Sequence, residues 1–219
     1  MKFYIDDGNT EKIRKLYDTG VFRGVSTNPS IISKSKRNPL ELINEILDIT
    51  DGILFVQALS NHYDDLLKEA AAISKICQDR IVVKIPFSTY GLKAAKELEN
   101  RSVRTLITAI YSFEQGALAV ESGAEFIAPY VNRMINAGTP VDHVLMMQQY
   151  IERHDKDCEI VAASFKNLEQ IRTVIDYGID SITISTDLYE AIFGNILIEK
   201  AIRDFESDWN SIPGKNWVI

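Results

Sequence analysis

Short apolar runs alternate with amphipathic, helix-like segments along the whole chain, and this alternation limits the fold more than any other feature. A short aliphatic or β-branched run bounded by turn residues is typical of a buried strand, whereas apolar residues three and four apart are typical of a helix. Each expected strand is followed by helical sequence, and no change of composition marks a linker. The expected strands are Lys2–Asp6, Gly24–Thr27, Ile53–Ala58, Ile81–Ile85, Val103–Ile107, Phe126–Ala128, Glu159–Ala163 and Ser181–Ile184.

The segments between the strands carry helix and turn signals. Asn28-Pro29-Ser30 turns the chain after the second strand, and we expect Ser30 to cap a helix that begins at Ile31. Met134–Thr139 is expected to be a loop. The other expected helices are Thr10–Asp18, Leu40–Ile49, Tyr63–Cys77, Ser88–Leu98, Ser112–Glu121, Pro140–His154, Asn167–Tyr177, Asp187–Phe193 and Asn195–Trp209.

Eight strands that alternate with helices predict an α/β fold, a single (β/α)8 TIM-type barrel with an extra C-terminal helix. An open, doubly wound sheet is the alternative, but the first strand is not followed by the G-x-G-x-x-G turn that such sheets use to bind dinucleotides. We expect residues 1–219 to form one barrel domain, in which 195–219 supplies the additional helix and tail.

Charge and cysteine content restrict the partners and the compartment. The formal net charge is −7 and no basic block is present, which argues against nucleic acid and anionic membranes as partners. Cys77 and Cys158 are far apart and form no C-x-x-C pair, as in a reduced cytosolic protein. No apolar run reaches membrane-spanning length, and the N-terminus turns acidic at once, unlike a signal peptide. We therefore expect a cytoplasmic protein.

Lys84 is the anomaly of the fourth strand, because it lies in the apolar run Arg80–Pro86. A buried ammonium costs several kcal/mol unless it is paired or loses its proton. Lys84 is therefore either a structural residue paired to a carboxylate such as Asp6, or a neutral amine that acts as a nucleophile. The pattern alone leaves both interpretations open.

Polar residues also stand at or just after almost every other expected strand end, which is the end that carries the active site in barrels of this kind. Side-chain alternation places Lys84 on the same face as Val82, and Asp6 on the same face as Tyr4, so these faces are expected to line the barrel interior. The polar residues are Asp6, Thr27, Asn28, Gln57, Lys84, Thr108, Tyr130, Arg133, Ser164 and Lys166.

This set of residues suits carbon–carbon bond chemistry. A free amine attacks ketones and gives a Schiff base, which acts as an electron sink for cleavage of a neighbouring C–C bond. Asp6 is a candidate to move a proton on a substrate hydroxyl. The other candidates are Gln57, Thr108 and Tyr130 for holding a water or relaying a proton, and Arg133, Ser164 and Lys166 for binding a phosphate.

Each of these residues, taken alone, has a simpler interpretation as a cap, a packing residue or a solvated side chain. Only their joint placement at one end of a barrel favours a functional site. We expect His62, His143 and His154 on the surface, and we expect no metal or other cofactor, because a metal-dependent aldolase needs a cluster of histidine and carboxylate ligands.

Four motifs, in this order, resemble those of the transaldolase and fructose-6-phosphate aldolase family, in its branch of small subunits. They are Gly24-Val25-Ser26-Thr27-Asn28-Pro29-Ser30, Val82-Val83-Lys84-Ile85-Pro86, Ala128-Pro129-Tyr130-Val131-Asn132-Arg133 and Ala162-Ala163-Ser164-Phe165-Lys166. The resemblance implies a metal-free class I aldolase chemistry in which Lys84 forms the Schiff base and Asp6 assists proton transfer. It further implies that Asn28 contacts the hydroxyls of a dihydroxyacetone unit, and that Arg133, Ser164 and Lys166 lie on the phosphate side.

At four positions the chain resembles the aldolases of this family. Gln57, Leu106, Ala128 and Tyr130 stand where transaldolases typically carry Glu, Asn, Ser and Phe. We therefore expect a fructose-6-phosphate aldolase that forms dihydroxyacetone and glyceraldehyde 3-phosphate. The alternatives are a transaldolase that transfers the dihydroxyacetone unit between sugar phosphates, and a non-catalytic barrel that binds sugar phosphates.

The chain also departs from the family pattern. Asp7 and Ser26 stand where a threonine is usual, and Ile184-Ser185-Thr186-Asp187 replaces the usual Pro-Leu after the eighth strand. The C-terminal stretch adds Phe205, Trp209, Ile212, Trp217, Val218 and Ile219, more apolar residues than one barrel has room to cover. The resemblance implies that this stretch packs on a neighbouring subunit of a homopentamer, often paired as a decamer.

Overall fold

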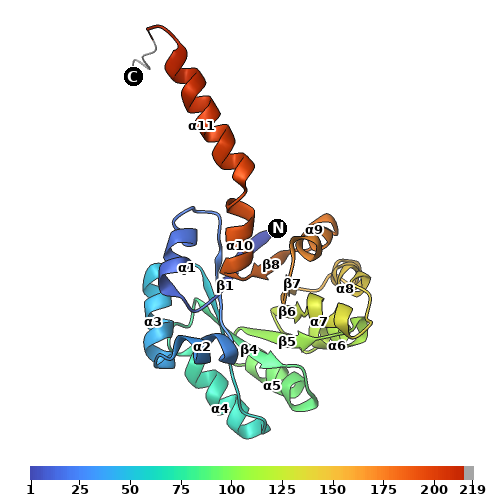
Figure 1. Ribbon diagram of the computed structural model, residues 1–219. Helices are drawn as coiled ribbons and strands as arrows, with labels where there is room; N and C mark the ends of the chain where they lie inside the picture. Colours follow the sequence, from blue (N-terminus) through green and yellow to red (C-terminus); the bar gives the residue numbers. More distant parts are fainter. Residues whose placement is uncertain (215–219) are drawn as a thin grey trace. The chain divides into compact units, whose positions relative to one another are not determined.

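The computed structural model describes residues 1–214, and its eight strands form the expected closed barrel (Figure 1). All pairings are parallel, and β8 pairs with β1 to close the barrel. The strands are β1 (Lys2–Asp6), β2 (Gly24–Ser26), β3 (Ile53–Gln57), β4 (Ile81–Pro86), β5 (Thr105–Ile110), β6 (Phe126–Pro129), β7 (Glu159–Ala162) and β8 (Ser181–Ile184). The prediction of a (β/α)8 barrel is confirmed.

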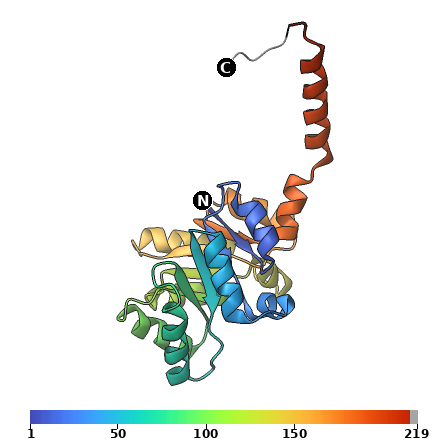
Figure 2. The same ribbon diagram turned by 90° about the vertical axis from the view of Figure 1, so that its left-hand side faces the viewer.

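Helices cover the outside of the barrel, and α1 lies beside α3 as α4 lies beside α5 (Figures 1 and 2). They are α1 (Thr10–Tyr17), α2 (Pro29–Ser35), α3 (Pro39–Ile49), α4 (Tyr63–Ser74), α5 (Thr89–Glu99), α6 (Phe113–Glu121), α7 (Val131–Asn136), α8 (Asp142–Arg153) and α9 (Leu168–Asp176). Several begin at a side-chain cap that follows a strand, such as Asn9, Ser88, Ser112 and Asn167. Each cap satisfies a backbone N–H that the first helical turn leaves free.

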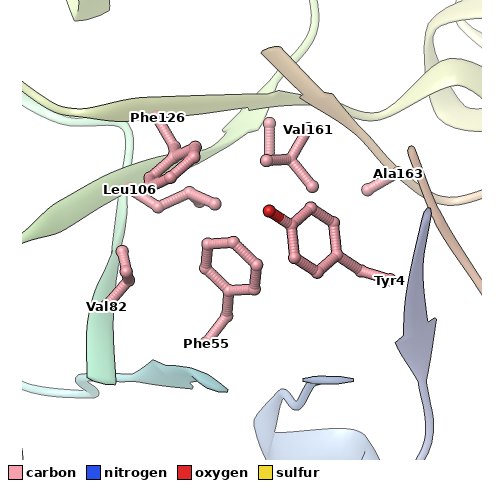
Figure 3. Close-up of a cluster of buried hydrophobic side chains, with 8 residues drawn as sticks. Tyr4, Phe55, Val82, Leu106, Phe126, Val161 and Ala163 are labelled. Carbon is pink, nitrogen blue, oxygen red and sulfur yellow. The ribbon is translucent and has the colours of Figure 1, made fainter. Parts of the chain in front are cut away.

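Apolar side chains from most strands fill the centre of the barrel (Figure 3). The ring of Phe55 makes edge contacts with the rings of Tyr4 and Phe126, at centroid distances of 5.1 and 5.4 Å. Val82 and Leu106 join this cluster, as the alternation along their strands predicts. Burial of one such aromatic side chain contributes about 1.5–3 kcal/mol to stability. The centre of the barrel is therefore a packed apolar core and not an open channel.

Strand β5 differs from the prediction because it begins at Thr105 and runs to Ile110, later than the expected Val103–Ile107. The N–H of Val103 donates to the carbonyl of Leu98 in the turn that ends α5, so Val103 is not available to the sheet. A bulge then interrupts the pairing with β6 between Thr108 and Ile110. Thr108 consequently lies inside the strand, and the bulge falls directly after it.

Two predicted connections are also wrong. The side chain of Asn28, and not Ser30, caps α2 by accepting from the N–H of Ile31, and Pro29 takes the first helical position. Part of the expected loop Met134–Thr139 belongs to α7, which begins at Val131. Val131 and Met134 are buried three residues apart, a spacing typical of one face of a helix.

Residues from 187 onward form a second compact unit. It contains α11 (Ile196–Ser211), and most of α10 (Thr186–Phe193), the helix that spans the boundary. Ile198, Ile202, Phe205 and Trp209 share one face of α11 by their spacing. The expected tail residues Trp217, Val218 and Ile219 lie outside the described part of the chain. Within residues 1–214, no helix is both long and apolar enough to cross a membrane.

Candidate active site

Lys84 lies inside the barrel, with only 5% of its surface exposed. Its Nζ donates hydrogen bonds to Oγ of Ser26 at 3.1 Å and to the carbonyl oxygen of Thr27 at 2.9 Å. Ser26 ends β2 and Thr27 directly follows it, and both partner groups are neutral. Burial lowers the pKa of the Lys84 amine below its ordinary value, and the charge of Asp6 opposes this shift. Burial therefore shifts Lys84 toward the uncharged form, which is the nucleophilic form of an amine.

Asp6, at the end of β1, is the carboxylate whose charge acts on Lys84. Burial raises the pKa of Asp6, while the charge of Lys84 and the hydroxyl of Ser26 lower it in part. The alternative of a simple ion pair would hold Lys84 charged and Asp6 ionised. Burial opposes such an ion pair because it disfavours both charges, while the attraction between the two groups supports it.

Gln57 and Thr108 lie on β3 and β5, the strands on either side of Lys84, and Tyr130 directly follows β6. Gln57 is paired in register with Lys84 across β3 and β4. The Thr108 hydroxyl donates to the Tyr130 hydroxyl at 2.9 Å. Burial raises the pKa of Tyr130, with a smaller opposing effect from Thr108, so the phenol holds its proton and is available as a donor. These polar groups from β3, β5 and the end of β6 face the same end of the barrel.

Arg133 is exposed on α7, and its guanidinium lies over the ring of Tyr130 at 5.1 Å from the ring centroid. It also donates to the hydroxyl of Tyr111 at 3.4 Å. Tyr111 in turn meets the Tyr130 ring edge-on at 5.8 Å. The two tyrosines therefore hold the cation over the mouth of the barrel while leaving it in contact with solvent.

Ser164 and Lys166 belong to the connection between β7 and α9. Ser164 has a φ of 64°, in the left-handed region that non-glycine residues seldom adopt. Its carbonyl accepts from the N–H of Asn132 at 3.0 Å, which joins this connection to the start of α7. Lys166 is exposed, and its charge acts on Asp6, so it lies at the same end of the barrel.

Thr27 and Asn28 are mainly engaged with the backbone. The Thr27 hydroxyl donates to the carbonyl of Phe55 at 2.9 Å, and its own carbonyl receives Lys84. The Asn28 side-chain oxygen accepts from the N–H of Ile31 at 3.0 Å. An asparagine side chain also carries an NH₂ group, which remains the part of Asn28 suited to a substrate hydroxyl.

Asp7 is not a second free carboxylate beside Asp6. One of its oxygens accepts from the N–H groups of Gly8 at 2.7 Å and Asn9 at 2.9 Å, and the other accepts from the hydroxyl of Thr186. Thr186 is 1% exposed and stands just after β8. Two of the departures from the family pattern, Asp7 and the residues that follow β8, therefore contact each other. This contact ties the end of β1, and with it Asp6, to the end of β8.

Thr186→Val is expected to destabilise the barrel by about 1–2 kcal/mol, because it keeps the shape of Thr186 and leaves the Asp7 carboxylate without a donor. Urea denaturation measures this loss. Thr173→Val is the control, since the Thr173 hydroxyl donates to the carbonyl of Glu169 within its own exposed helix. A double-mutant cycle with Asp7→Ala should give a coupling of about 1 kcal/mol, and a coupling near zero would contradict the contact.

Two residues at this end of the barrel were not among the predicted site residues. Ser26 contacts the amine of Lys84, and Tyr111 contacts both Arg133 and Tyr130. The sequence did contain a signal for Ser26. It is the last residue of the second strand, and the first strand, its neighbour in a barrel, ends in Asp6. Tyr111 directly follows β5, but nothing in the sequence shows that the bulge carries the chain there.

Comparison with known proteins identifies the family of this barrel. A profile of the family "Transaldolase/Fructose-6-phosphate aldolase" matches residues 3–215. The chain belongs to this family. It is 33% identical to a probable transaldolase of Thermodesulfovibrio yellowstonii over 213 residues, which cover 97% of this chain and 99% of the relative. It is 34% identical to a probable transaldolase of Streptococcus pyogenes serotype M5 over 212 residues, 96% of this chain and 99% of the relative.

The match confirms the resemblance seen in the four sequence motifs, and with it an enzyme of the transaldolase and aldolase type. A structural comparison supports the fold independently. Inosine 5' monophosphate dehydrogenase from Legionella pneumophila superposes with a TM-score of 0.58 at 17% identity, over 86% of this chain and 58% of that chain. At this identity the likeness concerns the barrel alone.

Proposed function

We propose that this family member is a class I aldolase that cleaves fructose 6-phosphate to dihydroxyacetone and glyceraldehyde 3-phosphate, reversibly. The observation that carries the proposal is the buried amine of Lys84, held by the neutral groups of Ser26 and Thr27 with its pKa lowered by burial. An amine of this kind is the nucleophile that a metal-free aldol reaction needs.

The reaction begins when the Lys84 amine attacks the ketone carbon of the sugar. Asp6 gives its proton to the departing hydroxyl, which leaves as water, and the resulting iminium draws electrons from the neighbouring C–C bond. Asp6 accepts the proton of the C4 hydroxyl as the C3–C4 bond breaks, and the aldehyde product leaves. The proton that Asp6 has gained then passes through a water to the enamine that remains, and hydrolysis of the resulting iminium releases dihydroxyacetone and restores the amine and the Asp6 proton.

Cleavage rather than transfer is supported by the residues around Lys84. Transfer requires the three-carbon enamine to stay bound until a second aldose arrives, whereas cleavage requires its protonation and release. The hydrogen-bonded pair of Tyr130 and Thr108, together with the neutral Gln57 in register with Lys84, supplies donors for the water that protonates the enamine. Leu106 and Ala128 are buried apolar residues and offer the bound fragment no side-chain hydrogen bond.

Arg133 and Lys166 are the cations that we assign to the substrate phosphate, with Ser164 as a neutral donor beside them. They extend from the connections after β6 and β7 and retain solvent exposure, as a site for a dianionic group requires. The chain as a whole has a net charge of −7 and therefore repels an anionic substrate. Arg133 and Lys166 supply a local positive charge that attracts the phosphate.

A second candidate, transaldolase activity, is favoured by the names of the two relatives described above, both probable transaldolases. One preparation assayed for both reactions separates the candidates. The aldolase proposal expects free dihydroxyacetone from fructose 6-phosphate alone. Efficient transfer to erythrose 4-phosphate with negligible free dihydroxyacetone would contradict it and support transfer. A barrel that only binds sugar phosphates would show neither product.

We further propose a cytoplasmic homopentamer or decamer as the setting of this activity. The cysteines Cys77 and Cys158 are unpaired thiols, as the reducing cytoplasm maintains them. The apolar face of α11, formed by Ile198, Ile202, Phe205 and Trp209, is the surface we assign to a neighbouring subunit. Light scattering during size-exclusion chromatography measures the subunit number directly.

A further inference from the structure

Ser26 stands between the two ionisable groups of the site. Its hydroxyl accepts from Lys84 Nζ at 3.1 Å and also interacts with the carboxylate of Asp6. Strands β1 and β2 place Asp6 and Ser26 opposite each other in register. A serine hydroxyl has one proton to donate and lone pairs that accept, so it serves an amine on one side and a carboxylate on the other.

The surroundings of Ser26 give it no other evident task. Its side chain is only 2% exposed, so it is not a solvated loop residue. The helix that follows β2 is capped by Asn28. The apolar cluster in the barrel centre takes no side chain from β2. What remains for the Ser26 hydroxyl is its contact with Lys84 and Asp6.

We propose that Ser26 relays a proton from the Lys84 ammonium to the Asp6 carboxylate, and so produces the free amine and the neutral acid in one step. One N–H bond of Lys84 breaks as the Ser26 oxygen gains that proton. The original O–H bond of Ser26 breaks as Asp6 gains the second proton. Ser26 ends with one proton, as it began, and the net charge of the site does not change.

The setting of the pair disfavours the charged reactants of this transfer. Burial disfavours both the ammonium and the carboxylate, although their mutual attraction opposes this. The charged groups that act on Asp6 are Lys84 from β4, Asp7 directly after β1 and Lys166 from the connection after β7. The charged group that acts on Lys84 is Asp6. Because the transfer is internal, the fraction of free amine is independent of pH while the pair shares one proton.

The relay rests on the proposed nucleophilic role of Lys84, and the rate of imine formation with dihydroxyacetone tests both. Borohydride quenching at timed intervals, between about pH 5 and 9, measures this rate. The wild-type rate is expected to be flat with pH. In Ser26→Ala the Lys84 proton must pass to a base in solvent, and this transfer is expected to limit the rate, which should fall roughly 100-fold and rise with pH. Ser26→Thr keeps the hydroxyl and should restore both the rate and the flat profile.

Ser181→Ala is the matched control. Ser181 is a fully buried strand serine whose hydroxyl donates to the carbonyl of Ile160 at 2.8 Å, at the opposite end of the barrel, so its loss should leave the rate unchanged. The relay is overturned if Ser26→Ala reacts at the wild-type rate with a flat profile, or if Ser26→Thr is as slow as Ser26→Ala. A wild-type protein that forms no adduct overturns the proposed function instead.

A solvent isotope measurement on the wild-type protein tests the relay without relying on the folding of any variant. Two protons move together in the relay, so the rate of imine formation in mixtures of H₂O and D₂O should fall along a curve as the deuterium fraction rises. A straight line, the signature of a single proton in motion, would contradict the relay.

Discussion

Lys84→Met is expected to reduce both cleavage of fructose 6-phosphate and transfer of its three-carbon unit by roughly 10⁴-fold or more. Methionine keeps the unbranched stem of Lys84 and removes the amine, so no imine forms and no electron sink exists for the C–C bond. Initial rates with purified protein measure the effect. The fold should survive, because the substitution removes a polar group that is only 5% exposed and replaces it with an apolar one.

The control for this variant is Lys93→Met. Lys93 lies on the exposed side of α5, where its Nζ sits over the ring of Tyr63 at 4.0 Å, away from the barrel interior. The activity of Lys93→Met should equal that of the wild type. If Lys84→Met retained more than about one-tenth of the activity while thermal unfolding showed an intact fold, Lys84 would be a buried structural lysine and the imine mechanism would be wrong.

Tyr130→Phe is expected to reduce release of free dihydroxyacetone by roughly 100-fold, and transfer to an added aldose by much less. The hydroxyl of Tyr130 is the acceptor of the Thr108 hydroxyl and a donor for the water that protonates the enamine. Without it the enamine persists longer, and a second aldehyde has more time to capture it. The ratio of transfer to hydrolysis, measured on one sample with erythrose 4-phosphate present, should therefore rise.

Tyr150→Phe provides the comparison for Tyr130→Phe. Tyr150 also donates its hydroxyl, to Glu121 at 2.9 Å, but it does so on α8 outside the barrel. This variant should leave the product ratio unchanged. An equal loss of cleavage and transfer in Tyr130→Phe would indicate that Tyr130 serves as packing for Tyr111 and Arg133, and would remove the reason to prefer cleavage.

The barrel was predictable from sequence because each strand is short, apolar and followed by helical spacing. The strict alternation of side chains also identified the interior face, and Tyr4, Phe55, Val82 and Leu106 all lie there. The predicted bounds of strands and helices were wrong where the backbone hydrogen bonds of a turn decide where an element begins. Val103 belongs to a helix-ending turn and not to β5, and α7 begins immediately after Tyr130. Hydrogen bonds of this kind leave no periodic signal in the sequence.

For the candidate site, the sequence predicted which strand ends come together better than it predicted the contacts between their side chains. Strand ends of a parallel barrel meet at one end, so Asp6, Gln57 and Lys84 had to lie near one another. The partner of Asp7 was not predictable, since Thr186 is far from it in the chain and joins it only when β8 closes on β1. Ser26 was overlooked because a serine in a turn-like motif has many ordinary uses.

The central claim, that Lys84 is the nucleophile, is tested most directly by locating the covalent adduct. The wild-type protein is treated with dihydroxyacetone and borohydride, digested, and analysed by mass spectrometry. We predict one reduced adduct, on the peptide that carries Lys84, with Lys166 and the surface lysines unmodified. An adduct on Lys166 or another lysine, or none under conditions of measured turnover, would contradict the account.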